Sequence, residues 1–237
     1  MSIAAKRVVI LISGRGSNMA ALVEAAASSD FPAEIVGVIS DKANAPGLQF
    51  ASSRGIATRV IARGDFADKA AHDAAIDAAL AGFGAEIVCL AGYMRLFTIP
   101  FVEKWQGRMI NIHPALLPVL KGLDTHSRAL AAGMRIHGCT VHFVTPEMDD
   151  GPIIAQSAVP VLLGDTADTL SARVLKAEHH LYPLALRLVA EGKAAMRNGK
   201  TVFSEPDHVV ENPHQALTSP SAVRDTVDLE ALARFTP

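Results

Sequence analysis

The sequence predicts an α/β fold, an open, mostly parallel twisted sheet with helices on both faces. Half of the 237 residues are hydrophobic but only 5% are aromatic, so Ala, Val, Ile and Leu must build the core. Such a composition is typical of parallel strands covered by helices on both sides. Short β-branched runs alternate with helical patterns along the chain, which favours right-handed β-α-β units. The length is ample for one large domain or two small ones.

The first predicted unit is a strand, a glycine loop and a helix. A Val, Ile and Leu run at 8–12 stops at Ser13-Gly14-Arg15-Gly16-Ser17-Asn18, and a helical pattern follows. In this layout the free N–H groups at a helix start can meet an anion, and the glycines let the backbone approach it. The loop completes neither a G-x-G-x-x-G fingerprint nor a Gly-Lys-Ser/Thr motif. It therefore favours a phosphate monoester, with a ligand-free turn capped by Ser17 or Asn18 as the alternative.

Three more strands are predicted from short apolar runs, at 35–39, 57–61 and 87–90. Helical patterns separate them, and the longer helix opens at Asp65-Phe66 and runs to about Phe83. The last of these strands ends at Ala91-Gly92-Tyr93-Met94-Arg95-Leu96-Phe97. The large apolar side chains and the single Arg of that segment can line a pocket for a flat, partly anionic ligand, or they can be ordinary core residues.

The next strand carries the most informative chemistry, in Asn111-Ile112-His113-Pro114-Ala115-Leu116-Leu117-Pro118. Alternation along a strand puts residues i and i+2 on one face, so Asn111 and His113 should point together. They stand at the carboxyl end of the strand, where ligands bind in open α/β sheets. Pro114 lacks a backbone donor and Pro118 fixes a second bend, so the segment is rigid. A capped strand end with a hydrogen-bonded Asn and a partly exposed His is the alternative.

A turn-rich loop with three carboxylates follows a later strand, as Thr145-Pro146-Glu147-Met148-Asp149-Asp150-Gly151-Pro152. Strands are predicted at 139–144 and 153–161 on either side of it, and His142 in the first is interpreted as a hydrogen-bonded histidine of the core or sheet face. A carboxylate of the loop would favour the imidazolium form of His113 if the sheet brought the two together. Otherwise the loop is a solvated acidic turn.

The longest predicted helix lies within 165–192, and the chain after it loses regular patterning. Glu178 sits at the edge of the buried stripe of this helix, so its carboxylate should face the body of the protein. We predict a catalytic domain over residues 1–203. Residues 204–237 are interpreted as an extension that wraps the surface or is partly disordered, because they hold four prolines and no sustained strand.

Composition and missing motifs exclude several classes of function. A formal charge of -2 without a Lys/Arg-rich run argues against nucleic acid, and no stretch approaches ~20 apolar residues as a membrane span would require. Cys89 and Cys139 lie in apolar runs, which predicts buried reduced thiols in a cytoplasmic protein without a signal peptide. No spacing of the nine histidines matches a metal site, and no nucleophile elbow is present. A metal-free, non-covalent mechanism with His, Asn and a carboxylate remains.

Taken together, these segments resemble phosphoribosylglycinamide formyltransferases. The resemblance spans roughly residues 7–200 and rests on the loop at 13–18, the segments 91–95 and 111–118, His137-Gly138-Cys139-Thr140-Val141-His142-Phe143-Val144, and Asp149-Asp150-Gly151-Pro152. It implies a Rossmann-like formyltransferase fold. It also implies transfer of a formyl group from 10-formyltetrahydrofolate, a co-substrate, to the amine of glycinamide ribonucleotide in purine synthesis, with no metal. The partners are then small-molecule substrates, and the oligomeric state is open, a homodimer being one option.

The resemblance also implies roles for individual residues. The catalytic residues are Asn111, His113 and Asp149. The ribonucleotide contacts are Gly16, Ser17, Asn18 and Glu178. The folate contacts are Lys69, Met94, Arg95, Leu96, Phe97, Asn111, Thr145, Pro146, Glu147, Met148 and Asp149.

Two departures and three other functions stay in view. Val119-Leu120-Lys121 replaces the Lys-Tyr-Pro-like piece expected in relatives, and Leu175 replaces a polar residue near the acceptor. A formyltetrahydrofolate deformylase, which passes the formyl group to water, is the nearest alternative. A methionyl-tRNA formyltransferase would need a carboxy-terminal RNA-binding domain, and a non-enzymatic phosphate- or folate-binding module would bind without turnover.

Overall fold

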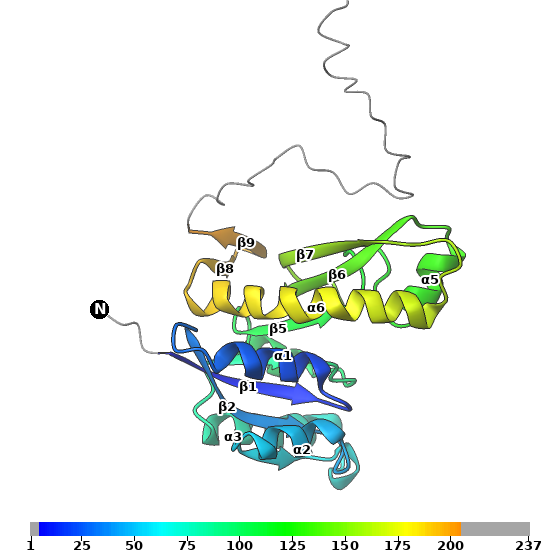
Figure 1. Ribbon diagram of the computed structural model, residues 1–237. Coiled ribbons are helices and arrows are strands. Elements are labelled where there is room, and N and C mark those ends of the chain that lie inside the picture. The colour runs from blue at the N-terminus through cyan, green and yellow to red at the C-terminus, as the bar shows by residue number, and fades with distance from the viewer. Residues whose placement is uncertain (1–4, 205–237) are drawn as a thin grey trace, which may run out of the picture.

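A seven-stranded sheet lies at the centre of the structure, a computed structural model that describes residues 5–204 (Figure 1). The strand order is β3-β2-β1-β4-β5-β6-β7. The strands are β1 (Lys6–Ile12), β2 (Ala33–Ser40), β3 (Thr58–Val60), β4 (Ile87–Leu90), β5 (Met109–His113), β6 (Ile136–Phe143) and β7 (Ile153–Pro160). Each overlaps an apolar run that predicts a strand, so the pattern of the sequence located the whole sheet.

Most of the sheet is parallel, as predicted. β1 pairs in parallel with β2 and β4, and β2–β3 and β4–β5 are parallel as well. β6 is antiparallel to both β5 and β7. The chain builds β2 and β3 on one side of β1 and then crosses to β4 on the other side. This reversal is a topological switch point, and a crevice for ligands is expected beyond the carboxyl ends of β1 and β4.

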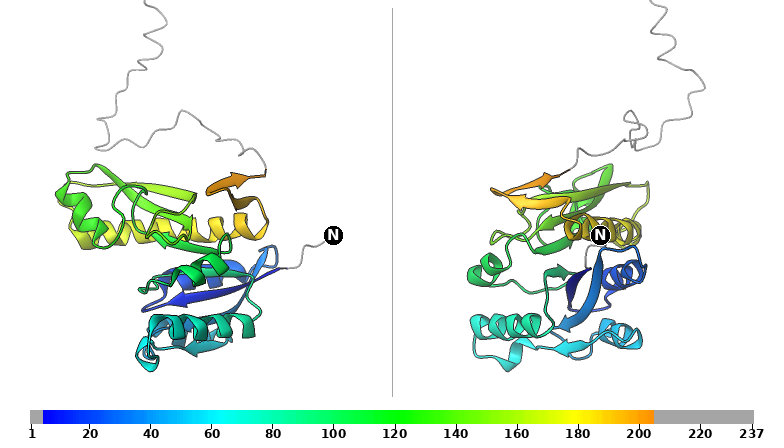
Figure 2. Two further views of the ribbon diagram at one scale, coloured as in Figure 1. Left: turned by 180° about the vertical axis from the view of Figure 1, so that it is seen from behind. Right: turned by 90° about the vertical axis from the view of Figure 1, so that its left-hand side faces the viewer.

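Helices cover both faces of the sheet (Figure 2). They are α1 (Ser17–Ala26), α2 (Pro46–Ser53), α3 (Lys69–Gly82), α4 (Ile99–Lys104), α5 (Thr125–Ala131) and α6 (Ala167–Ala190). The central strand β1 feeds two separate cores by simple alternation. Val8, Ile10 and Ile12 pack in the layer that contains residues of α1 and α6, while Val9 and Leu11 pack in the layer with α3 and α4. A central strand buried on both faces explains its uninterrupted apolar sequence.

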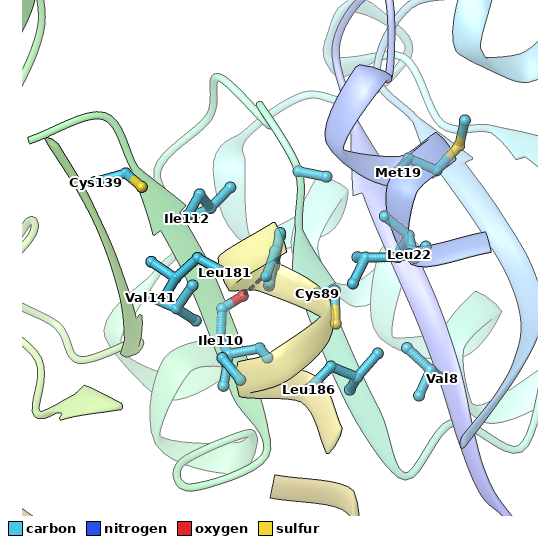
Figure 3. Packing of buried hydrophobic residues seen from close by; sticks show 14 of the residues in the cluster. Val8, Met19, Leu22, Cys89, Ile110, Ile112, Cys139, Val141, Leu181 and Leu186 are labelled. Atoms are coloured by element: carbon cyan, nitrogen blue, oxygen red, sulfur yellow. Dashed lines mark hydrogen bonds between the residues drawn. The ribbon is translucent and has the colours of Figure 1, made fainter. Parts of the chain in front are cut away.

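Helix α6 packs against the two adjacent parallel strands β4 and β5. Leu181 and Leu186 pack among the side chains that project from these strands (Figure 3). The hydroxyl of the fully buried Tyr182 lies 3.0 Å from the carbonyl oxygen of Leu90 and 3.1 Å from that of Ile110, and it donates to them. A buried phenol needs such a partner. The contact fixes α6, and with it Glu178, relative to the carboxyl ends of the two strands.

Three elements differ from the sequence prediction. Helix α3 begins at Lys69, not at Asp65, because Asp68 is its N-cap and accepts a hydrogen bond from the backbone N–H of Ala71 at 2.8 Å. The short helix α4 was not predicted, since six residues are too few to show helical periodicity. The hairpin of β8 (Ala194–Arg197) and β9 (Lys200–Phe203) was not predicted either, because each strand has only four residues.

The thiols follow their prediction, and the extension is not described. Cys89 and Cys139 are both buried and free. No helix between residues 5 and 204 has the length and apolar character needed to cross a membrane. Of the predicted extension, residues 205–237 lie outside the described part of the chain.

Two histidines, one half-buried and one fully buried, lie side by side near the end of β5. The rings of His126, in α5, and His137, in β6, pack edge to face with centroids 5.3 Å apart. His137 is fully buried, and neither of its ring nitrogens has a hydrogen-bond partner of good geometry within residues 5–204. Burial, and next the charge of His126, lower the pKa of His137 from 6.5 to about 4. The Pro114 backbone opposes the effect of burial on the pKa of His137.

This pair predicts a loss of stability in mild acid. Between pH 6.5 and 4, His137 is protonated in the unfolded chain but neutral in the folded chain. The free energy of unfolding therefore falls as the pH falls. The effect is at most on the order of 3 kcal/mol. His137→Gln should flatten urea-unfolding stability between pH 7 and 4.5, whereas the exposed His180→Gln should not. Equal slopes in both variants would contradict the prediction.

Candidate active site

The glycine loop after β1 forms a tight cradle at the start of α1. Gly16 adopts a left-handed conformation with φ 73°, and a Cβ there would lie 3.1 Å from the Cα of Gly47. The N–H of Gly47 donates to the carbonyl of Gly14 at 3.2 Å, which fastens α2 to the loop. No side chain caps α1, so the predicted cap from Ser17 or Asn18 is absent. The N–H groups at the start of this helix therefore have no side-chain acceptor, the arrangement that suits an anion.

Asn18 reaches across to α6 instead of capping its own helix. Its Nδ2 donates to Glu178 Oε2 at 2.6 Å, although 160 residues separate the two positions. Glu178 is only 6% exposed, as the helical stripe predicts. Burial raises the pKa of its carboxyl group, and the hydrogen bond from Asn18 works in the opposite direction. The glycine loop and the long helix thus share one polar contact inside the crevice.

His113 stands between two acceptors at the end of β5. Its Nδ1 lies 3.4 Å from Asp149 Oδ2, and its Nε2 donates to the carbonyl of Leu120 at 3.0 Å. The imidazole is 5% exposed. The ring thus faces a carboxylate on one side and a backbone carbonyl on the other. The condition under which the acidic loop becomes informative, a carboxylate beside His113, is met.

Asn111 contacts His142, which the sequence analysis interpreted as a hydrogen-bonded histidine of the core or sheet face. The Nδ2 of Asn111 lies 3.2 Å from His142 Nε2, and His142 Nδ1 donates to the carbonyl of Phe143 at 2.9 Å. His142 therefore carries its proton on Nδ1 and accepts from the amide. Burial lowers the pKa of His142, with its bond to Phe143 and the charge of Asp149 opposing, which keeps the ring neutral. The register of β5 on β6 pairs Asn111 with His142 directly.

Backbone constraints fix the loop that carries Asp149. This residue has φ 52°, a left-handed conformation uncommon outside glycine, and its Oδ2 accepts from the N–H of Gly122 at 2.9 Å. Gly151 packs so closely that a Cβ would lie 1.7 Å from the carbonyl oxygen of Phe143. Asp149 Oδ1 is also 3.9 Å from His142 Nε2. One carboxylate thus faces both histidines of the site.

The segment after β4 borders a cavity of about 350 Å³. Met94 is 60% and Leu96 65% exposed, so neither is a core residue. Phe97 is different, because its ring stacks between those of Tyr93 and Phe101, with centroids 5.3 Å and 4.4 Å away. The cavity is lined by Arg63, Lys69, His72, Met94, Arg95 and Leu96. Of the predicted folate contacts, Pro146, Glu147 and Met148 are exposed on the acidic loop, while Thr145 is half-buried.

Comparison with known proteins agrees with this geometry. The family model of formyl transferases matches residues 6–186, more than half of the chain. The chain belongs to the formyl transferase family. A phosphoribosylglycinamide formyltransferase of Escherichia coli K12 is 42% identical over 189 residues, covering 80% of this chain and 89% of that protein. A solved phosphoribosylglycinamide formyltransferase from Brucella melitensis is 62% identical, with a TM-score of 0.76, covering 78% of this chain and 96% of that one.

Other relatives place the family in different settings. The trifunctional purine biosynthetic protein adenosine-3 of Bos taurus is 50% identical over 202 residues, which cover 85% of this chain. The chain spans only 20% of the length of that relative. A solved formyltetrahydrofolate deformylase from Pseudomonas syringae has a TM-score of 0.79 but is 27% identical, and the match covers 85% of this chain and 67% of that one.

The loop where this formyl transferase departs from the expected pattern is built into the site. Leu120, whose carbonyl receives His113, has φ 60°, an unusual conformation for leucine. The neighbouring Lys121 forms an ion pair with Asp150, next to Asp149. This ion pair links the two loops that flank His113. Within residues 5–204 no group of three or more His, Cys, Asp or Glu side chains could hold a metal ion.

The close packing of Gly151 yields a direct test of this site. Gly151→Ala should force the loop off Phe143 and move Asp149 from His113, with a loss of unfolding free energy of about 1–3 kcal/mol. Gly82→Ala, where a Cβ has no neighbour within 4 Å, is the control. Chemical denaturation measures the first effect, and changed ring resonances of His113 in NMR spectra report the second. Unchanged His113 signals in Gly151→Ala would refute the coupling.

Proposed function

We propose that this chain transfers the formyl group of 10-formyltetrahydrofolate to the amine of glycinamide ribonucleotide in purine biosynthesis. The observation that carries the proposal is the position of His113 between Asp149 and the Leu120 carbonyl, with Asn111 on the same strand end and the glycine loop at the carboxyl end of β1. Relatives named phosphoribosylglycinamide formyltransferase, matched over 89% and 96% of their length, support it. Residues 1–203 are then the catalytic domain.

The glycine loop is the proposed site of the acceptor's phosphate. The backbone N–H groups at Gly16, Ser17 and Asn18 open α1 without a side-chain cap, and they can receive phosphate oxygens. Glu178, held by Asn18, lies close enough to the loop to contact the other end of the same small molecule. A carboxylate there can orient the glycinamide amine, with its free electron pair directed at the formyl carbon.

The formyl donor is proposed to lie on the other side of His113. Met94 and Leu96 expose apolar surface that can cover a flat ring system, and the cavity beside them is lined by cations. The acidic loop from Thr145 to Asp149 is proposed to form the opposite wall. Lys69 and Arg95 supply positive charge for the carboxylates of the folate.

The chemistry needs one bond made and one broken. The neutral amine attacks the formyl carbon, and the C–N bond to the folate nitrogen breaks as the proton lost by the amine reaches that nitrogen. Negative charge develops on the formyl oxygen, and Asn111 and the His113 imidazolium are the proposed donors to it. His113 or a water carries the proton, with Asp149 stabilising the charged ring.

The resting contacts define what must change when substrates bind. Both N–H groups of His113 already face acceptors, so one of them has to be redirected before it can stabilise the formyl oxygen. The Leu120 carbonyl is the neutral acceptor of the two and is therefore the weaker competitor. Asn111 is better placed, because the contact with His142 occupies one of its two amide hydrogens.

A reducing compartment is consistent with this role. The two cysteines are free and buried, which fits a cytoplasmic protein.

The nearest alternative, a deformylase, is tested by the acceptor. Tetrahydrofolate release from 10-formyltetrahydrofolate should require glycinamide ribonucleotide and match the appearance of formylated product. The open cradle at the start of α1 favours a phosphorylated acceptor over water. Equal release with and without the ribonucleotide would make this a hydrolase.

Removing either member of the His113–Asp149 pair should stop catalysis without stopping acceptor binding. His113→Ala and Asp149→Asn should each lower turnover on the order of 10²–10³-fold, the usual cost of an oxyanion donor or its support. Binding of glycinamide ribonucleotide, followed by calorimetry, should stay close to wild type because the glycine loop is untouched. Wild-type-like turnover in either variant would end this assignment.

The Glu178 carboxylate should lower the stability of the fold while it contributes to binding of the ribonucleotide. Its buried carboxylate is costly when charged, as the raised pKa indicates, so Glu178→Gln should retain the contact with Asn18 and be as stable as wild type or more stable at pH 7. The same change should raise KM for glycinamide ribonucleotide while KM for the folate stays constant. Thermal unfolding and two-substrate kinetics measure both effects, and a lower stability together with an unchanged KM would contradict them.

A further inference from the structure

The cavity beside the proposed folate site has an unusual charge. Three of its six lining residues are the cations Arg63, Lys69 and Arg95, and none is a carboxylate. His72 donates from Nε2 to the carbonyl of Ile61 at 2.9 Å, which occupies one of its nitrogens. A cavity of about 350 Å³ with this lining suits an anionic group of a small molecule.

Two of the cations are tethered but not neutralised. Lys69 Nζ donates to the carbonyl of Phe97 at 2.7 Å, and Arg63 Nη1 donates to the carbonyl of Phe66 at 2.8 Å. Neither takes part in an ion pair with another residue between 5 and 204. Both side chains are half-buried, so their orientation is set while their charge stays available.

The third cation, Arg95, is held by a buried carboxylate. Arg95 Nε donates to Asp41 Oδ2 at 2.8 Å, and the Asp41 side chain is fully buried while that of Arg95 is 47% exposed. Asp41 directly follows β2, so its position is fixed by the sheet. The bond uses Nε and leaves Nη1 and Nη2, the pair that receives a carboxylate in a bidentate manner.

The anchor carries a cost that stability alone does not explain. Asp41 Oδ1 is buried and has no hydrogen-bond partner in the part of the chain that the structure describes, and the same is true of the hydroxyl of the neighbouring Tyr93. Burial, and next the charge of Asp41, raise the pKa of Tyr93, so the phenol stays neutral. Unsatisfied buried polar atoms are few in native structures, and each calls for an explanation. Asp41 is therefore better explained by what it does to Arg95 than by packing.

We propose that Asp41 is a positioning residue and Arg63 a further substrate contact for the carboxylates of the formylfolate's glutamyl group. Asp41 holds the Arg95 guanidinium with its outer nitrogens toward the cavity. Arg63 adds a cation at the far side, beyond the Lys69 and Arg95 contacts already proposed. This inference rests on the proposed function and adds two residues, Asp41 and Arg63, to the recognition of the donor's carboxylates.

The test compares two formyl donors that differ only in the glutamyl group. They are 10-formyltetrahydrofolate and 10-formyltetrahydropteroate, which lacks it. Arg63→Ala and Asp41→Ala should each raise KM for the first donor on the order of tenfold, the loss of about one charge-assisted hydrogen bond, with kcat unchanged. With the second donor the variants should match wild type. A residue of merely structural importance would lower activity with both donors.

Conservative and matched variants complete the design. Asp41→Asn keeps an acceptor for Arg95 Nε and should lie between wild type and Asp41→Ala. The exposed Arg135→Ala, in the turn before β6, removes a cation elsewhere and should change neither KM. If Asp41→Ala does not fold, Arg63→Ala still decides the cavity's role.

The outcomes separate this inference from the proposed function. Equal losses with both donors, or no change with either, overturn the inference. Failure of the wild-type protein to formylate glycinamide ribonucleotide from either donor overturns the proposed function instead.

Discussion

The contact between Asp149 and His113 is the interaction on which the rest of the site depends. It joins the end of a parallel strand to a loop between two antiparallel ones, so it exists only because β6 returns alongside β5. The loop reaches His113 through an unusual backbone at Asp149 and through a glycine pressed against Phe143. Backbone strain of this kind is held in place by surrounding packing and is common at functional sites.

Electrostatics then divides the polar groups of the crevice into charged and neutral members. His113 lies between a carboxylate and a carbonyl, and in the proposed mechanism it is the imidazolium. His142, more deeply enclosed, is neutral and can therefore accept from Asn111. The two histidines near Asp149 thus have different roles in this proposal, because they differ in burial and in their hydrogen-bond partners.

Much of this was predictable because its causes are local. Strand positions follow from apolar runs, the pairing of Asn111 with His113 follows from alternation, and the burial of Glu178 follows from helical spacing. The role of His142 was not, since it depends on the register that sets β5 against β6. The start of α3 was misplaced because Asp65 and Asp68 are equally plausible caps in sequence, and only the backbone selects between them. The ion pair between Lys121 and Asp150 could not be predicted either, because it links two loops that are far apart in the chain.

Buried polar atoms without partners indicate where this chain loses stability. The two cores are mostly apolar, but several buried side chains have a polar atom without a partner within residues 5–204, among them His137 in β6 and also Asn18, Asp41, Asp73 and Tyr93. Asn18, Asp41 and Tyr93 lie beyond the carboxyl ends of β1, β2 and β4, around the switch point where the topology leaves a crevice. A fold selected only for stability would replace them with apolar groups. Their presence at one edge of the sheet is best understood as preorganisation: polar atoms are kept dry and oriented so that a substrate completes the hydrogen bonds that the protein leaves open.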